Sequence, residues 1–427
     1  MQESYITEIK IKQVRHLHDI SIPINKEERT HLILTGKNGS GKTSVLEALR
    51  DHLEGVINGN FAKSFAWRSQ IKSNTEKILK GEELLKSEPL GSNRYIQIYQ
   101  EVNSLKEQKE QLEKQISIFE KVNVNIYSER PLIENHNQGV FIITYFDITT
   151  RVTKYFKKSE KVPAPIPIND GQDFDNKIGA YFEQFLVNQR FNQLLAMEED
   201  NKDQYNNINR WFSSFEKNLA RIFEVDKLAL VYDRTQFQYL IKIDKSNNST
   251  LQTLPSGYAS IINILAELFM RMDNEGSPAY DQQGIVLIDE IDAHLHIDLQ
   301  KNILPFLTSL FPKIQFIVST HSPFILNSLQ NAVVYDLEKQ IRIEDLSRYS
   351  IDGIVETYFD SDKYSNEVKK EIEEYEQLVF STNLELAQKD RMYDLKRKLK
   401  KIPAHLAPEL VSRFQQIESK RLAANHG

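Results

Sequence analysis

The first sixty residues alternate between apolar and polar positions and then change to a helical spacing. Residues 6–14 place apolar side chains at every second position, and residues 21–24 repeat this pattern, which is typical of paired strands with one buried face. Residues 31–35 form an apolar run that predicts a buried strand. A glycine-rich turn follows, and then apolar residues come at helical spacing, namely Val45, Leu46, Leu49 and Leu53. The pattern predicts a strand, a tight turn and a helix in succession.

Residues 61–139 differ from their surroundings because charged and glutamine residues become frequent and glycine nearly disappears. Apolar residues recur there in steps of four and three, at Ile98, Val102, Leu105, Leu112, Ile116 and Phe119, with Lys109 at the one missing position. This spacing predicts a helical insertion in the form of a protruding, coiled-coil-like hairpin. The alternative is an ordinary amphipathic helix packed on the domain.

The second half of the chain changes character twice. Residues 140–146 form a buried-strand run, residues 174–224 carry the apolar stripes of helices, and residues 228–243 read as a β-hairpin. From 284 to 337 short apolar strands alternate with helical segments, which favours a parallel sheet flanked by helices. The expected domains are an α/β head over residues 1–60 and 140–345, the helical insertion over 61–139, and a charged helical C-terminal region over 346–427.

Composition excludes several classes of function. The chain has 427 residues, a net charge of −6 and no cysteine, so disulfides, thiolate metal sites and cysteine nucleophiles are excluded. The negative charge excludes a uniformly basic nucleic-acid coat but leaves room for a local basic groove. No run reaches the roughly 18 to 20 apolar residues that a membrane-spanning helix needs, so we expect a cytoplasmic protein without membrane contact.

The turn before the first predicted helix carries the pattern GxxxxGK[ST]. Its residues are Gly36, Lys37, Asn38, Gly39, Ser40, Gly41, Lys42 and Thr43, followed by Ser44. In this pattern the glycines let backbone N–H groups surround a phosphate, the Lys42 ammonium reaches the β- and γ-phosphates, and the Thr43 hydroxyl ligates Mg²⁺. The turn therefore predicts the binding of ATP and Mg²⁺, with Lys42 also part of the catalytic site.

A second motif lies about 250 residues later. Residues 284–288 are an apolar strand that ends in Asp289 and Glu290. In P-loop ATPases, an Asp at this place orients Mg²⁺ and its waters, and the adjacent Glu polarises the attacking water. We expect Asp289 to bind the metal ion and Glu290 to act as the catalytic base.

The next predicted strand, residues 314–320, ends in His321. The carboxyl ends of parallel strands lie at the edge of the sheet where such proteins bind ligands. An imidazole at this edge can hydrogen-bond the γ-phosphate and the attacking water, so we expect His321 to sense the γ-phosphate.

Ser256 and Gly257 begin an apolar helical segment. A serine hydroxyl and closely approachable backbone N–H groups at a helix start can bind an anion. Taken alone, this motif is equally typical of a capped helix after a turn. Its place between the P-loop and the acidic strand end makes it a candidate for a second phosphate contact.

The order of these motifs resembles the ABC-type ATPase heads of the RecF, SMC and OLD proteins over roughly residues 4–60 and 140–337. That resemblance implies that Ser256 and Gly257 form the signature motif, which contacts the ATP bound to the opposite subunit of a head-to-head, ATP-dependent dimer. The run Asp289–His296 looks like the DExxxHLH variant of OLD-like and defence ATPases. The opening strand is similar to the family's, which implies that Arg15 lies near the nucleotide.

Two features depart from the family pattern. The signature reads Leu-Pro-Ser-Gly-Tyr over residues 254–258 instead of LSGGQ, which suggests slow or gated hydrolysis. No clear Q-loop glutamine is present: Gln138 precedes the strand at 140–146, and Asp147 directly follows it. We expect Asp147 to take the Q-loop place as a ligand of the metal ion.

We expect no nuclease centre in the tail. Asp360 and Asp362 form an isolated DxD without the surrounding strand–helix alternation that a metal nuclease site needs. Residues 395–401 instead form a basic helical run, which is typical of a contact with DNA phosphates, of a surface for a partner protein, or of a solvated helix.

A compact head without its own nuclease resembles the ATPase subunits of bacterial anti-phage systems such as Septu and PARIS. That resemblance implies a sensor and scaffold that controls a separate nuclease or toxin effector, in a dimer or a higher oligomer. The main alternative is a RecF-like DNA-repair clamp that works on DNA without a toxic partner. A transporter-type subunit and a self-contained nuclease are further alternatives.

Overall fold

The computed structural model describes residues 3–148, 157, 159, 163–166, 178–236, 238–243, 248–274, 277–278, 282–351, 353–354, 366–381, 385–402 and 408–424. The chain divides into two compact units, Met1–Tyr349 and Ser350–Gly427. The Asp360–Asp362 pair lies outside the described residues.

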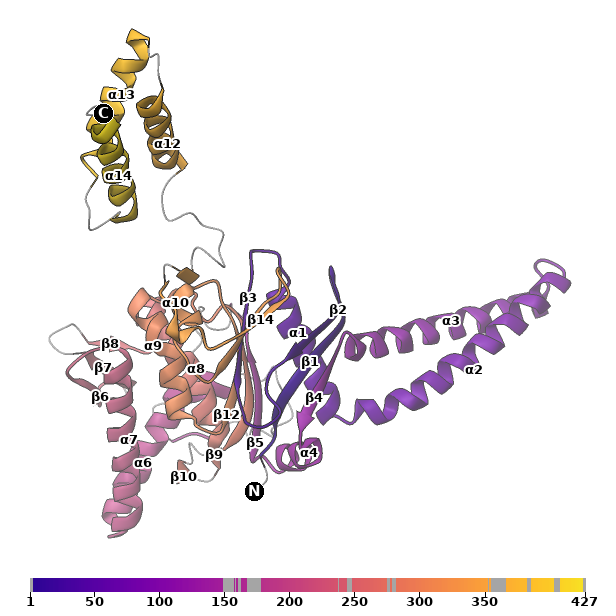
Figure 1. Ribbon diagram of the computed structural model, residues 1–427. Coiled ribbons are helices and arrows are strands. Elements are labelled where there is room, and N and C mark those ends of the chain that lie inside the picture. The colour runs from indigo at the N-terminus through magenta and orange to yellow at the C-terminus, as the bar shows by residue number, and fades with distance from the viewer. Residues whose placement is uncertain are drawn as a thin grey trace. The chain divides into compact units, whose positions relative to one another are not determined.

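A six-stranded sheet forms the centre of the first unit (Figure 1). Its strands, in spatial order, are β14 (Ile341–Glu344), β13 (Ala332–Asp336), β3 (His31–Thr35), β12 (Ile314–Ser319), β11 (Gln283–Ile288) and β5 (Phe141–Phe146). All neighbours pair in parallel except β14, which runs antiparallel at one edge. Every residue of the five parallel strands is buried, as expected for a sheet covered by helices on both faces. The predicted α/β fold of a P-loop ATPase head is confirmed.

A second, antiparallel sheet consists of β2 (Leu17–Pro23), β1 (Tyr5–Val14) and β4 (Val122–Tyr127). Its apolar face packs with α1 (Lys42–Ile57) in the main core. Strand β4 lies within residues 61–139, the range predicted as a helical insertion, and it was not identified from the sequence. The segment Val-Asn-Val-Asn-Ile-Tyr alternates with period two, but it directly follows the long helical pattern, which obscured it.

Helices α2 (Asn60–Ser87) and α3 (Asn93–Glu120) lie side by side in the region of the predicted hairpin (Figure 1). Their approach is close, because a Cβ atom added at Gly81 would lie 2.4 Å from Val102 Cγ2. The base of this pair packs on α1: a Cβ atom at Gly55 would lie 2.4 Å from the Phe119 ring, and His52 Nδ1 is 3.1 Å from Phe119 O. The helix that follows the glycine-rich turn is thereby joined to the helical pair.

The first unit contains further helices and strands. They are α4 (Glu129–Asn137), η1 (Ile178–Tyr181), α6 (Phe182–Glu198), α7 (Lys202–Ile222), β6 (Leu228–Asp233), β7 (Gln238–Ile243), β8 (Ser249–Thr250), α8 (Ser256–Met272), β9 (Asp273–Asn274), β10 (Ser277–Pro278), α9 (Ile297–Leu310), α10 (Pro323–Leu326) and η2 (Leu346–Arg348). An aromatic cluster joins α6, α7 and α8. The ring centroid of Phe215 lies 5.3–5.6 Å from those of Phe182, Trp211 and Phe269. The predicted β-hairpin is present as the antiparallel pair β6–β7.

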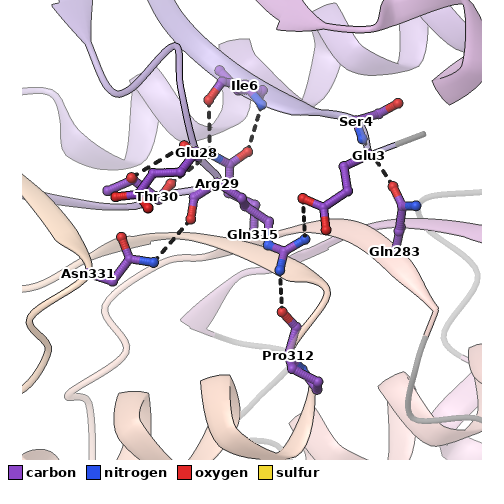
Figure 2. A network of polar contacts seen from close by, with 10 residues as sticks. All are labelled: Glu3, Ser4, Ile6, Glu28, Arg29, Thr30, Gln283, Pro312, Gln315 and Asn331. Atoms are coloured by element: carbon purple, nitrogen blue, oxygen red, sulfur yellow. Dashed lines mark hydrogen bonds and ion pairs between the residues drawn. The ribbon is translucent and has the colours of Figure 1, made fainter. Parts of the chain in front are cut away.

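The amino ends of the parallel strands form what we call the base edge of the main sheet, and polar side chains join it there to β1 (Figure 2). Gln315 Oε1 accepts a hydrogen bond from Ile6 N at 2.7 Å, and Gln315 Nε2 donates to Ile6 O and Thr30 O at 2.9 and 2.8 Å. Gln283 Oε1 accepts from Ser4 N at 3.0 Å. These bonds satisfy buried backbone groups and fix one sheet on the other.

The second unit contains α12 (Asn366–Phe380), α13 (Leu386–Leu399) and α14 (Pro408–Ala424). Its small core consists of Ile372, Tyr375, Met392, Leu395, Leu399, Leu410 and Ile417. Cations of the predicted basic run are paired within the unit, since Lys398 Nζ lies 2.8 Å from Glu371 Oε1 and Lys396 pairs with Glu418. These cations of α13 are thus paired with carboxylates of α12 and α14.

Candidate nucleotide site

The glycine-rich turn lies between β3 and α1, at what we call the P-loop edge of the sheet. Gly36, Gly39 and Gly41 have φ angles of 130°, 85° and 98°, which L side chains rarely adopt. A Cβ atom at Gly36 would also lie 2.8 Å from Ser40 Oγ. Only glycine therefore suits this path, which turns the backbone into the cradle that a phosphate requires.

Lys42 occupies the first turn of α1 and is 6% exposed. Its Nζ donates to Gly36 O at 2.8 Å and to Lys37 O at 3.1 Å, so the ammonium lies over the cradle. Burial lowers the pKa of Lys42, while the carboxylates of Glu290, Asp289, Asp292 and Asp336 act in the opposite direction. The site thus brings a desolvated cation and several carboxylates together.

The remaining turn residues differ in exposure. Lys37, Asn38, Gly39 and Thr43 are exposed, whereas Ser40, Gly41 and Ser44 are buried. Within the described residues, the buried Ser40 Oγ has no hydrogen-bond partner. A buried polar atom without a partner normally calls for a ligand, and the atom lies inside the cradle.

Ser319, the last residue of β12, holds the acidic strand end in place. Its Oγ donates to Asp289 Oδ1 at 2.5 Å and accepts a hydrogen bond from Glu290 N at 2.7 Å. Asp289 N donates to Phe146 O at 2.8 Å, and Asp289 is 3% exposed. Glu290 is only partly buried and has a φ of 45°, unusual for a residue with a side chain. The two carboxylates therefore differ in exposure, because Asp289 is buried and Glu290 is partly exposed.

His321 follows β12 and lies in the same electrostatic neighbourhood. Burial lowers its pKa, the Lys42 charge lowers it further, and the carboxylates of Asp292, Glu290 and Asp289 act in the opposite direction. The imidazole is therefore neutral near neutral pH, with one nitrogen free to donate and the other to accept.

Asp147 and Arg15 approach this edge from other elements. Asp147 directly follows β5; burial raises the pKa of Tyr145, and the charges of Asp289 and Asp147 add to that shift. Arg15 lies in the two-residue turn between β1 and β2, with a φ of 53°. That turn packs on the cradle, because a Cβ atom at Gly41 would lie 2.9 Å from Leu17 Cδ1.

Ser256 and Gly257 lie in a different environment from Lys42. They begin α8, where Ser256 is exposed and a Cβ atom at Gly257 would lie 2.9 Å from His294 O. Next to them is a pocket of about 480 Å³. Its lining consists of Phe223, Glu224, Pro255, Gly257, Tyr258, His294, His296, Asp298 and Leu299. We call this region the signature surface.

Several residues of the site were not found from the sequence. Ser319 precedes the predicted Thr-His pair, and its position at a strand end was the only available signal. Glu338, in the turn between β13 and β14, accepts a hydrogen bond from Lys37 N at 3.4 Å and lies 3.1 Å from Lys37 Nζ. No local pattern connects these two positions, which lie 301 residues apart.

The donors present fit a Mg²⁺ ion. Thr43 and Asp289 supply hard oxygen atoms at the cradle, and Mg²⁺ in nucleotide sites is typically held by one or two such groups together with phosphates. The described residues hold no cluster of three or more His, Asp or Glu side chains that could bind a metal ion by themselves.

Comparison with known proteins gives a family. Residues 32–327 match the profile of AAA_21, described as "AAA domain, putative AbiEii toxin, Type IV TA system". The chain is 27% identical over 334 residues to the Septu protein PtuA of Bacillus mycoides (strain KBAB4), covering 77% of this chain and 40% of that protein. It is 35% identical over 153 residues to the "Retron Ec83 probable ATPase" of Escherichia coli, covering 33% and 27%. The chain thus spans less than half the length of either relative.

Among solved structures, an SMC head bound to the C-terminal winged-helix domain of ScpA is similar. The similarity has a TM-score of 0.37 and 13% sequence identity, and it covers 79% of this chain and 96% of that one. This low score adds nothing to the fold that the strand order establishes. Among the described residues, no helix combines the length and apolarity that a membrane span needs.

Proposed function

Since the chain belongs to the AAA domain family AAA_21, we propose that it binds and hydrolyses ATP as a subunit of an anti-phage defence complex. One observation carries the proposal: Lys42, Asp289, Glu290 and His321 meet at one edge of the sheet. The charges of Asp289 and Glu290 act on the pKa of both Lys42 and His321. A cation in a glycine cradle, beside one buried and one partly exposed carboxylate, suits phosphoryl transfer to water.

The roles follow from burial and position. Lys42 would contact the β- and γ-phosphates from inside the cradle, and Ser40 Oγ is available to a phosphate oxygen. Thr43 and Asp289 would hold Mg²⁺, and Asp147 directly after β5 would be a further ligand. When bound, Mg²⁺ supplies charge neutralisation on the phosphate oxygens.

Glu290 is proposed as the base because it is the accessible member of the pair. Its carboxylate would take a proton from water as the water oxygen attacks the γ-phosphorus, and the bond to the β–γ bridging oxygen would break to release ADP and phosphate. Neutral His321 would donate a hydrogen bond to a γ-phosphate oxygen and so report its presence. Arg15, in the turn that packs on Gly41, would contact the nucleotide from the side of β1.

The signature surface is proposed to complete the ATP site of a second copy. Ser256 is exposed, and the adjoining pocket is lined by Gly257 and Tyr258 but by no residue of the glycine-rich turn. A phosphate-binding helix start that does not line its own cradle is explained if two heads pair with two ATP molecules between them. The degenerate signature, Leu-Pro-Ser-Gly-Tyr in place of LSGGQ, supports slow or gated turnover.

The defence role rests on the relatives. The chain covers only part of the Septu protein PtuA and of the retron ATPase. The activity of those proteins is therefore a proposal for this chain. We propose that pairing and separation of the heads control a separate nuclease or toxin effector. The pairing of α13 cations with carboxylates of α12 and α14 favours a protein partner over DNA for this unit.

The ATPase is tested by two substitutions. Lys42→Ala is expected to weaken ATP binding by about 100-fold or more, because the buried cation that faces the phosphates is lost. Glu290→Gln is expected to keep ATP affinity within a few-fold, lower turnover by about 100-fold, and accumulate ATP-bound pairs. Calorimetry, phosphate release and sedimentation measure these quantities, and Glu107→Gln on an exposed face of α3 is the matched control. Wild-type turnover by Glu290→Gln would contradict the base assignment.

The defence role is tested by tagging the Glu290→Gln protein in its native cell and identifying what co-purifies with it. A nuclease or toxin subunit in stoichiometric amount is the expected result. DNA together with repair proteins, without such a subunit, would contradict it and favour a RecF-like clamp.

A further inference from the structure

A closed ring of hydrogen bonds joins the end of β12 to the loop after β11. Thr320 Oγ1 donates to Asp292 Oδ1 at 2.5 Å and accepts from Ser322 N at 2.9 Å. Ser322 Oγ donates to Gln300 Oε1 at 2.6 Å, and Gln300 Nε2 donates to Leu295 O at 2.8 Å. Leu295 N donates to Asp292 O at 3.1 Å and closes the ring. The ring therefore ties two strand ends and α9 into one unit.

One side of the ring determines where His321 lies. His321 stands between Thr320 and Ser322, and its backbone N–H lies 3.4 Å from Asp292 Oδ1. Ser322 is 6% exposed and also caps α10 through Phe324 N at 3.1 Å. The backbone on both sides of the imidazole is thus fixed by Asp292 and by Ser322.

The other side of the ring determines the shape of the signature surface. Leu295 stands between His294 and His296, which both line the pocket beside α8. His294 has a φ of 63°, and its carbonyl oxygen leaves no space for a Cβ atom at Gly257. A non-glycine residue keeps such a backbone only when its surroundings fix it, and the bond from Gln300 to Leu295 O is one such constraint.

Gln300 is the point where the two sides meet. Its carboxamide oxygen is used toward Ser322 and its nitrogen toward Leu295. Movement of the His321 segment relative to the loop at 293–296 must therefore break one of these two bonds.

We infer that Gln300 is a positioning residue that couples the γ-phosphate contact of His321 to the signature surface offered to a second copy. This inference rests on the proposed function, because it requires ATP-dependent pairing of heads. Through the Gln300 side chain of α9, the pairing of heads would depend on which nucleotide is bound. ATP, whose γ-phosphate engages His321, would favour the paired arrangement, and ADP would not.

The test uses Gln300→Leu, which keeps the side-chain size and removes both hydrogen bonds. In the Glu290→Gln background we expect the Kd for ATP on the separate head to stay within about twofold. The constant for ATP-dependent pairing should weaken by about tenfold or more, since two partly buried hydrogen bonds are lost. In the otherwise wild-type chain, the Hill coefficient of hydrolysis against ATP should fall toward that of independent sites.

Ser309→Ala, at an exposed position of α9 away from the pocket lining, is the matched control and should change neither quantity. Gln300→Glu keeps the acceptor for Ser322 Oγ and loses the donor to Leu295 O, so it should fall between the wild type and Gln300→Leu; it also serves if the leucine variant does not fold. Unchanged pairing in a folded Gln300 variant overturns the inference, and so does a parallel loss of ATP affinity on the separate head. If Glu290→Gln itself never pairs with ATP, the shared-site proposal fails instead.

Discussion

The two edges of the main sheet both hold buried polar side chains, yet they use them in opposite ways. At the base edge, Gln315 makes three hydrogen bonds to backbone atoms of Ile6 and Thr30. At the P-loop edge, the buried Ser40 Oγ has no partner among the described residues, and Lys42 lies among carboxylates. Satisfied polar groups at the base edge stabilise the fold, whereas the groups of the P-loop edge are arranged for a ligand that the fold itself does not supply.

The largest difference between the roles of the two edges is expected when Gln315 is replaced. Gln315→Leu leaves the backbone groups of Ile6 and Thr30 without partners in a buried place, so we expect the free energy of unfolding to fall by about 3 kcal/mol or more. ATP affinity of the folded protein should stay within about twofold. Urea unfolding and calorimetry measure the two quantities, with the exposed Gln13→Leu as the control. A loss of ATP affinity larger than the loss of stability would break the comparison.

His31 gives the base edge a pH signature. Its Nδ1 accepts a hydrogen bond from Phe316 N at 3.0 Å, and burial, followed by the charge of Arg29, lowers its pKa from 6.5 to about 4. Between pH 6.5 and pH 4 the imidazole is therefore protonated in the unfolded chain but stays neutral in the folded chain. The free energy of unfolding should therefore decrease as the pH is lowered through this window, by about 3 kcal/mol at its acid end.

His31→Gln should remove this dependence, because the carboxamide oxygen can accept from Phe316 N without titrating. Denaturant unfolding at a series of pH values measures the slope, and His18→Gln on the exposed face of β2 is the control. An unchanged slope in His31→Gln would assign the acid sensitivity to other groups.

The smallest effect on stability is expected at the P-loop edge. Ser319→Ala removes the hydroxyl that joins Asp289 to Glu290 N, so turnover should fall by about tenfold while the free energy of unfolding changes by about 1 kcal/mol. Phosphate release and urea unfolding provide the test, with Ser117→Ala on α3 as the control. If stability fell as far as in Gln315→Leu, the P-loop edge would be as structural as the base edge.

The sequence predicted the parts of the site that are contiguous in the chain. The glycines of residues 36–41 and the acidic strand end at Asp289 are recognisable because the chemistry of each demands residue types at fixed local spacing. The α/β fold followed from apolar strands that alternate with helical segments. The roles of the individual residues remain predictions for the experiments above.

The parts that the sequence did not predict depend on contacts between distant positions. Gln315 and Ile6 are 309 residues apart, and Ser319 and Asp289 belong to different strands. Strand β4 was missed because six alternating residues follow a helix of 28. A glutamine or serine in a sequence carries no sign of which backbone atoms it will meet, and only the folded chain supplies that information.

The packing of α1 on the helical pair has a mechanical consequence. Because Phe119 of α3 fills the space beside Gly55, the helix that begins with Lys42 cannot rotate without moving the root of α3. A helix of 28 residues is about 42 Å long, so a rotation of about 5° at the root displaces its far end by about 4 Å. The pair α2–α3 is therefore a lever arm whose short end is the nucleotide cradle. A partner bound at its distal end would be displaced by a movement of α1 and would also restrain that movement.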